Sequence, residues 1–220
     1  MTSSASPGDR RARRSTVVVL TGIDGSGKTT VARALGNLLA PEVPTLVLAN
    51  YSGRRLIKGW TERLGLTLSP RTLDAVESTI RLFNVVLNQL RARFFDGVVI
   101  MDRDLSCQQA LRAARGLPPA RFLAVLKRLL PAPDVALFLD VSVEEAHRRI
   151  ARRGTDSETL AHLSAYRDGY LSLPDFARFN RINADGPLLS VLDQVEEQLR
   201  PATAGRPQAA SRRNQPVPVR

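Results

Sequence analysis

The segment Gly22–Thr29 has the residue types and the spacing that bind a chain of phosphates. It reads Gly-Ile-Asp-Gly-Ser-Gly-Lys-Thr and fits the pattern G-x-x-x-x-G-K-[ST]. Glycines let consecutive backbone N–H groups turn toward one anion, and a helix that follows adds the positive end of its dipole. Lys28 can reach the outer phosphates of a nucleoside triphosphate, and the Thr29 hydroxyl can bind Mg²⁺. The segment therefore predicts a site for a nucleoside triphosphate with Mg²⁺, which switch proteins, motors and small-molecule kinases all share.

A second candidate pair, Asp102 and Arg103, follows the apolar run Val98–Met101. A carboxylate at the end of a buried strand near a phosphate loop suits a contact with Mg²⁺ or with a water bound to it. A guanidinium beside it suits a second phosphate group, because its planar fork matches two phosphate oxygens. We predict Thr29 and Asp102 as metal ligands, and Lys28, Asp102 and Arg103 as catalytic residues.

An alternation of strand-like and helix-like segments is expected to position these residues. Apolar runs without polar interruption predict strands that are buried on both faces, and helices between them predict a parallel sheet. The helix at 71–95 carries one apolar face that includes Val76, Ile80, Phe83, Leu87 and Leu90. Ligands of such sheets gather at the carboxyl ends of the strands. Strands are expected at 16–21, 45–48, 98–101, 135–140 and 179–183, and helices at 28–39, 54–64, 71–95, 106–115, 119–130, 143–153, 157–170 and 188–199.

Composition favours one globular domain between two basic tails. The chain has 220 residues, 43% of them hydrophobic, and a net charge of +11 that lies mostly in terminal segments rich in arginine, proline, serine and alanine. We therefore expect disordered tails at 1–15 and 201–220 around a domain at 16–200. The single cysteine, Cys107, excludes an internal disulfide. An apolar run long enough to span a bilayer is absent from the sequence, so a membrane partner is not expected and the cytoplasm is the expected compartment.

Together, the phosphate loop with Thr30 and the Asp102-Arg103 pair resemble the thymidylate kinase family of P-loop nucleoside monophosphate kinases, and the likeness extends over 16–199. The resemblance implies an α/β, three-layer P-loop kinase fold: a five-stranded parallel sheet, helices on both faces and an arginine-rich lid at about 148–158. It implies transfer of a phosphoryl group from ATP, with Mg²⁺, to dTMP or a related monophosphate. It also implies that the chain can form a homodimer. The residues that would hold the donor are Gly22, Asp24, Gly25, Ser26, Gly27, Lys28, Thr29, Thr30 and Arg148.

The lid assignment rests on four arginines and a glycine, Arg148, Arg149, Arg152, Arg153 and Gly154. Phosphoryl transfer needs cationic groups around the moving phosphoryl, and arginines on a mobile segment can close over it. The phosphate loop itself contains no arginine, and in this family such a loop is accompanied by a catalytic arginine in the lid. Arg153 or Arg152 is the predicted catalytic arginine.

Several acceptor residues are also implied by the resemblance. Arg81 lies 21 residues before Asp102, at the place of the family's acceptor arginine, and Asp24 resembles the loop carboxylate that bonds the acceptor's sugar. Glu77 stands where the family stacks an aromatic ring on the base, and the segment 49–55 lacks the family's prolyl turn and twin glycines. The predicted acceptor-binding residues are Asp24, Arg54, Glu77, Arg81, Arg103 and Gln108.

These departures leave the acceptor open. It is dTMP or a related monophosphate, or else another small metabolite such as a specialised nucleoside or an antibiotic-like alcohol. A neutral acceptor would need a base, for which Asp104 or Asp24 are candidates. A nucleic-acid-associated ATPase that uses the arginine tails is a hypothesis from another class, but the body has only a modest charge surplus and no series of stacking aromatic residues. Nucleic acid is therefore not an expected partner, and a non-catalytic nucleotide-dependent scaffold is a third alternative.

Overall fold

The computed structural model describes residues 15–49, 70–154 and 158–203, without the side chains of 70–75, 77, 78 and 81. The predicted helix at 54–64 and three lid residues at 155–157 lie outside the described part, as do residues 1–14 and 204–220 of the predicted tails. The predicted tail bounds of 1–15 and 201–220 are wrong at their inner ends, because Ser15 is buried and residues 201–203 form the last turn of α8. The strands are β1 (Thr16–Thr21), β2 (Thr45–Ala49), β3 (Val98–Asp102), β4 (Val135–Asp140) and β5 (Asn180–Asn183). The helices are α1 (Lys28–Leu39), α3 (Pro70–Arg93), α4 (Leu105–Ala114), α5 (Arg121–Leu129), α6 (Val143–Arg153), α7 (Leu160–Leu171), the 3₁₀ helix η1 (Phe176–Arg178) and α8 (Leu188–Thr203).

The five strands form one parallel sheet in the order β2-β3-β1-β4-β5. β1 is therefore central, with β3 on one side and β4 on the other, and the chain changes direction across the sheet at this point. Leu20 of β1 pairs with Asp102 of β3, which places the two strand ends level with each other. Such a switch point opens a crevice at the carboxyl ends of the strands. The predicted α/β parallel sheet is confirmed.

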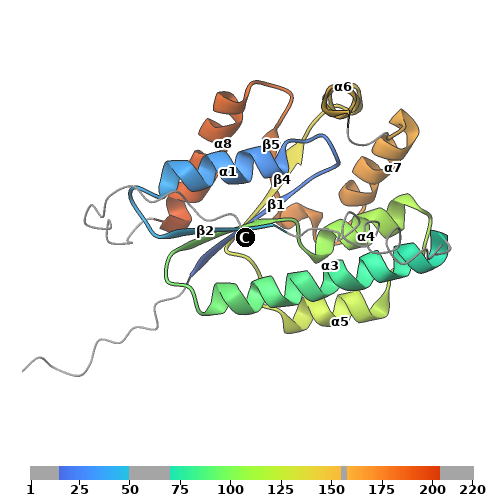
Figure 1. The fold of residues 1–220 in the computed structure, drawn as a ribbon, viewed down its shortest axis with the longest axis horizontal. Helices are drawn as coiled ribbons and strands as arrows, with labels where there is room; N and C mark the ends of the chain where they lie inside the picture. The colour runs from blue at the N-terminus through green and yellow to red at the C-terminus, as the bar shows by residue number, and fades with distance from the viewer. Residues whose placement is uncertain (1–14, 50–69, 155–157, 204–220) are drawn as a thin grey trace, which may run out of the picture.

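Helices cover both faces of the sheet, as the apolar strands require. Figure 1 shows α1 and α8 on one side of the strands, and α3 and α5 on the other. The larger hydrophobic cluster joins Val18, Leu20 and Ile100 of the strands to Leu35 of α1 and Val195 of α8. A second cluster joins the opposite faces of the same strands to Ala92 of α3. The central strands are thus buried on both faces, which explains their unbroken apolar sequence.

Close packing of α4 against α7 fixes the segment that follows the predicted lid. A Cβ on Gly169 would lie 2.3 Å from the carbonyl oxygen of Ala110, so only glycine allows this approach. Tyr166 and Tyr170 of α7 are buried beside it and stack at 5.1 Å between ring centroids. The Tyr166 hydroxyl lies 3.4 Å from the carbonyl oxygen of Cys107 in α4. α7 is thereby anchored to the helix that starts directly after β3.

The apolar face predicted for the long helix does not face the sheet. Val76, Phe83 and Leu90 are exposed, with 65% of Phe83 accessible, whereas Val85 and Ala92 are buried. Periodicity identifies an apolar face but not its neighbour, and here a second face of α3 covers the strands. The described part of the chain contains no helix that is both long enough and apolar enough to cross a membrane.

Smaller differences concern the ends of the elements. η1 was not predicted, and the predicted strand at 179–183 begins one residue later. The predicted helix at 119–130 is shorter at both ends, and its first turn starts only after Pro118, Pro119 and Ala120. α8 extends to Thr203 through Pro201, beyond the predicted end at 199. None of these differences moves a predicted site residue to another edge of the sheet.

Candidate active site

The phosphate loop is shaped by glycines that have no room for a side chain. A Cβ on Gly22 would lie 2.7 Å from the carbonyl oxygen of Leu139, and one on Gly25 would lie 2.5 Å from that of Ala146. The backbone of both residues also has positive φ, 140° and 83°. The loop is therefore pressed against the end of β4 and the first turn of α6. Larger residues at either position would displace the loop or these elements.

The first turn of α1 leaves its N–H groups available to an anion. Gly27 (φ 90°) begins the helix without a side-chain capping bond, and the first turn contains no acidic residue. Thr29 and Thr30 are exposed in that turn. An uncapped helix start, with its dipole directed at a glycine loop, favours a phosphate group. The predicted phosphate loop thus has the geometry that its motif requires.

Lys28 lies under this loop and is almost completely buried, with 4% of its surface exposed. Its Nζ donates hydrogen bonds to the carbonyl oxygens of Gly22 (3.0 Å) and Ile23 (2.6 Å) and to Oγ of Ser26 (3.2 Å). The pKa of Lys28 is lowered from 10.5 to about 8, chiefly by burial and also by the positive charge of Arg103. A phosphate group beside Lys28 would act in the opposite direction and favour the ammonium form.

Asp102 meets the loop from the end of β3. Its Oδ2 accepts a 2.6 Å hydrogen bond from the Thr29 hydroxyl, which confirms that the two predicted metal ligands lie together. Asp102 is 5% exposed, and its Oδ1 is a buried oxygen with no hydrogen-bond partner among the described residues. A buried carboxylate oxygen in this state is energetically unfavourable unless a cation or a water satisfies it. The pair is therefore suited to a divalent cation with oxygen ligands.

Arg103 faces the loop from the same strand end. Its Nη2 donates to Oδ1 of Asp24 at 2.6 Å, so two predicted acceptor residues form one ion pair. Burial opposes the charge of Arg103, but Asp24 outweighs it and holds the pKa of Arg103 above its usual range. Arg103 has φ 79°, the one positive φ among the described non-glycine residues, which costs roughly 1–2 kcal/mol. Strain at this position is typical of a functional side chain that the surrounding structure holds in place.

Asp104 does not occupy the position of a free base. Its Oδ1 accepts from the Ser106 backbone N–H at 2.9 Å and its Oδ2 from the Ser106 hydroxyl at 3.1 Å, so it caps α4. Burial raises the pKa of Asp104, and the positive charge of Lys127 opposes that rise. The Cys107 thiol one turn further on is buried and its pKa is raised, chiefly by burial. Neither side chain is presented to the phosphate loop by a described contact.

The arginines of the predicted lid form the second half of α6. Arg148 and Arg149 both pair with Glu145, at 2.6 and 2.7 Å, while Arg152 and Arg153 are exposed on the last turn. A Cβ placed on Gly27 would lie 4.0 Å from Nη1 of Arg149. Arg149 therefore approaches the phosphate loop, although it was not among the arginines predicted to act. Its place one turn after Ala146, the residue that contacts the loop, is visible only in the fold.

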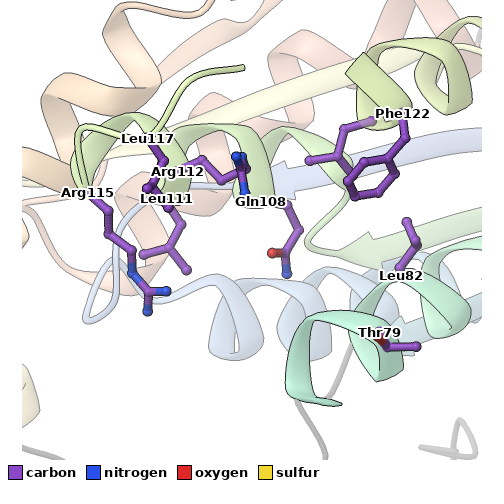
Figure 2. A pocket seen from close by; sticks show the side chains of 9 residues that line it. Thr79, Leu82, Gln108, Leu111, Arg112, Arg115, Leu117 and Phe122 are labelled. Carbon is purple, nitrogen blue, oxygen red and sulfur yellow. The ribbon is translucent and has the colours of Figure 1, made fainter. Parts of the chain in front are cut away.

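Gln108 borders a cavity of about 140 Å³ between α3, α4 and α5. In Figure 2 its amide points from α4 toward the side of α3 that carries Thr79 and Leu82. The cavity combines apolar walls with amide and guanidinium groups, which suits a flat polar ring. Its lining consists of Thr79, Leu82, Gln108, Leu111, Arg112, Arg115, Leu117, Phe122 and Leu123.

Three predicted acceptor residues are not placed. Arg54 lies outside the described residues, and the side chains of Glu77 and Arg81 lie outside the described part of α3. These three remain predictions. The described residues bring together the loop, Lys28, Thr29, Asp24, Asp102 and Arg103.

Comparison with known proteins gives a consistent result. The family model for thymidylate kinase matches residues 82–195, which include β3, the lid arginines and β5. A probable thymidylate kinase of Pyrococcus horikoshii is 33% identical over 194 residues, which cover 83% of this chain and 92% of the relative. The chain belongs to the thymidylate kinase family. A probable thymidylate kinase of Archaeoglobus fulgidus is 29% identical over 82% of this chain and 93% of the relative, and one of Pyrococcus abyssi is 32% identical over 83% and 92%.

Membership of the thymidylate kinase family makes the chain an enzyme that transfers a phosphoryl group. The prediction of a small-molecule kinase is thus confirmed, as is the α/β P-loop kinase fold. The family model begins after the phosphate loop, whereas the alignments with whole relatives cover most of the chain. The loop geometry described above therefore supports the assignment independently of the family model.

Proposed function

We propose that the protein is an ATP- and Mg²⁺-dependent kinase that phosphorylates dTMP or a related nucleoside monophosphate. The observation that carries the proposal is the convergence of Lys28, Asp102 and Arg103 at the carboxyl ends of β1 and β3. The names of the relatives support dTMP as the acceptor.

The phosphate chain of ATP, the phosphoryl donor, fits the glycine loop and the start of α1. Gly22, Gly25 and Gly27 leave backbone N–H groups without intervening side chains, and Lys28 supplies one ammonium beneath them. Ser26, Thr29 and Thr30 are the further donor residues that we propose in the loop. Arg149 would add a cation on the α6 side of the same loop. Arg148, which pairs with the same Glu145, remains a proposed donor contact.

A magnesium ion fits the Thr29–Asp102 pair. The unpartnered Oδ1 of Asp102 provides a buried anionic oxygen, and the Thr29 hydroxyl lies within hydrogen-bond distance of the same carboxylate. Both groups are hard oxygen ligands of the kind that Mg²⁺ prefers. When bound, Mg²⁺–ATP would supply the phosphoryl group and part of the charge neutralisation that its transfer requires.

The chain's own residues orient the acceptor and stabilise charge. Arg103 is proposed to bind the acceptor phosphate, for which it must exchange its bond with Asp24 for bonds to phosphate oxygens. Asp24 is proposed to bind a sugar hydroxyl of the acceptor. The cavity beside Gln108 is proposed to receive the base. A monophosphate acceptor needs no general base, which agrees with the capping role of Asp104.

A lid arginine is proposed to complete the site. Arg152 and Arg153 lie on the exposed last turn of α6, and Gly154 ends that helix in the left-handed conformation. A guanidinium that closes over the transferring phosphoryl would stabilise charge where it develops. Arg153, with Arg152 as the alternative, remains the proposed catalytic arginine.

The test is a coupled kinase assay with Mg²⁺–ATP and a panel of acceptors: dTMP, dUMP, the other deoxynucleoside monophosphates, thymidine and neutral nucleosides. We expect the highest kcat/KM for dTMP or a close relative, and loss of nucleotide binding in Lys28→Ala. Phosphorylation of nucleosides but of no monophosphate would contradict the proposed acceptor. Intact ATP binding by Lys28→Ala would contradict the proposed donor site.

We propose that two copies of the chain form a homodimer through the outward face of α3. This outer seam consists of Val76, Ile80, Phe83, Leu87 and Leu90 of α3 together with Phe94, which directly follows the helix. The residues alternate at spacings of four and three, the a and d pattern of paired helices, and Phe83 and Phe94 are 65% and 84% exposed. A second copy of the same helix would bury the seam.

Sedimentation velocity tests the dimer with Phe83→Glu and, as control, Val125→Glu, which changes an exposed apolar residue of α5. We expect a wild-type dimer, a monomeric Phe83→Glu variant and a dimeric Val125→Glu variant. A wild-type monomer, or a Phe83→Glu dimer, would contradict the assignment of the seam.

A further inference from the structure

Lys127 joins three segments that border the site. It lies on α5, and its Nζ donates to Oγ of Ser106 at 2.8 Å and to Oε1 of Gln109 at 3.3 Å, both on α4. The same ammonium pairs at 2.5 Å with Asp175, which immediately precedes η1. Its side chain is 27% exposed, whereas the next residue, Arg128, is exposed to solvent. One cation therefore connects the first turn of α4 to the segment after α7.

Ser106 transmits this restraint to the turn between β3 and α4. Its side chain is fully buried, and its single hydroxyl hydrogen is directed to Asp104. The lone pairs of the same oxygen accept from Lys127. A hydroxyl with a fixed donor on one side and a fixed acceptor on the other has one orientation. Because its backbone N–H also bonds to Asp104, the position of Asp104 is fixed relative to the helix.

Arg103, the residue before Asp104, has a backbone that needs such a restraint. Its φ of 79° is disfavoured for a side chain with a Cβ, and such a conformation persists only when neighbouring contacts hold it. On one side its N–H donates to the carbonyl oxygen of Leu20 at 3.0 Å. On the other side the fixed residue is Asp104. A change of φ toward negative values would swing the Arg103 guanidinium away from the phosphate loop.

We propose that Lys127 is a positioning residue for Arg103. By clamping Ser106 and thus Asp104, it holds the strained turn in which Arg103 faces Asp24 and the loop. Through Asp175 it also ties that turn to the segment that follows α7, so the positions of Arg103 and α7 are coupled. The inference rests on the proposed function, in which Arg103 binds the acceptor phosphate.

The experiment compares Lys127→Met with Arg128→Met, which removes the same charge from the exposed neighbouring residue. Titration calorimetry measures the Kd of dTMP and, separately, of the non-hydrolysable analogue AMP-PNP with Mg²⁺. In Lys127→Met we expect dTMP to bind about tenfold more weakly, because misplaced contacts lose affinity steeply, with AMP-PNP within about twofold. Arg128→Met should bind both ligands as the wild type does. Lys127→Arg, which keeps a cation and N–H donors, should recover most of the dTMP affinity.

Asp175→Asn is a second, milder variant that leaves Lys127 in place. We expect it to weaken dTMP binding about threefold in the same direction, because the ammonium keeps its bonds to α4 but loses its charged partner. Unchanged dTMP binding in both variants overturns the positioning role, and so does an equal loss of dTMP and AMP-PNP affinity in Lys127→Met. A wild-type protein that binds AMP-PNP but not dTMP overturns the proposed acceptor, and the inference with it.

Discussion

Lys28 offers a test of the site that requires no acceptor. The side chain is 4% exposed, and burial holds its pKa at about 8 instead of 10.5. At neutral pH the folded protein therefore carries a buried ammonium that the unfolded chain would solvate. Lys28→Met keeps much of the side-chain volume and removes the charge. The prediction concerns the pH dependence of stability in the two proteins without nucleotide.

The size and sign of the effect follow from the two pKa values. The difference between 10.5 and about 8 corresponds to about 3 kcal/mol against the charged form in the folded protein. Between these values the unfolded chain binds more protons than the folded protein, so the free energy of unfolding rises with pH. From pH 7 to pH 9 the part due to Lys28 is about 1.4 kcal/mol, a tenfold change in the unfolding equilibrium.

Urea denaturation at pH 7, 8 and 9 measures this quantity as the difference between wild type and Lys28→Met. The variant leaves the carbonyl oxygens of Gly22 and Ile23 without their donor, which costs about 1–3 kcal/mol but does not change with pH. Other groups, such as the Cys107 thiol, titrate in both proteins and cancel. We therefore expect the free energy of unfolding of the wild type, minus that of Lys28→Met, to rise by about 1.4 kcal/mol between pH 7 and pH 9.

A bound nucleotide should reverse this trend. AMP-PNP favours the ammonium form of Lys28, so its stabilisation of the wild type should be larger at pH 7 than at pH 9, and it should be small in Lys28→Met. Equal pH dependence of the two proteins without nucleotide would refute the argument that the Lys28 charge is desolvated. Equal stabilisation of both by AMP-PNP would refute its role in binding the donor.

Three further predictions test other parts of the site. Gly25→Ala should abolish AMP-PNP binding by calorimetry, because its Cβ would lie 2.5 Å from the oxygen of Ala146, whereas Gly116→Ala, with open space around it, should not. Arg149→Ala should raise the KM for ATP about tenfold and leave that for dTMP within about twofold, and the reverse pattern would contradict its place on the donor side. Asp140→Asn should lower the free energy of unfolding at pH 7, since arginine hydrogen bonds lower the pKa of Asp140 despite its burial. Because a lowered carboxyl pKa stabilises the fold above its unfolded value of 3.8, this difference should vanish in denaturation curves as the pH falls below 3.8.

The predictable part of the molecule is the part that depends on neighbours in sequence. The glycines of the phosphate loop, Lys28 and Thr29 lie within one strand-turn-helix unit, so their spacing alone fixes what they can bind. Asp102 was predictable because a parallel strand ends at a known edge of the sheet, level with Leu20 of β1. Four apolar runs were enough to predict β1 to β4, whereas β5, Asn180–Asn183, has only Ile182 buried and is not an apolar run.

Contacts between distant segments escaped prediction. The sequence contains four arginines at 148–153, and the packing of Ala146 on Gly25 places Arg149, one turn later, beside the loop. Lys127 lies 21 residues from Ser106 and 48 from Asp175, and no local pattern pairs them. The exposure of Phe83 could not be predicted either. The helix α3 has two apolar faces, and periodicity does not decide which one meets the sheet.

Two arginines and one threonine that are proposed to bind phosphate or metal are already hydrogen-bonded to carboxylates of the protein. Arg103 is held by Asp24 and Arg149 by Glu145, and Thr29 is held by Asp102. A ligand phosphate must therefore compete with carboxylates that are already in place, so each guanidinium contributes to affinity only the excess of its new bonds over the old ones. Within the described part of the chain, the hydrogen-bond acceptors of Lys28 are carbonyl and hydroxyl oxygens only. It gains a full negative partner on binding, so its substitution should reduce donor affinity more than that of either arginine.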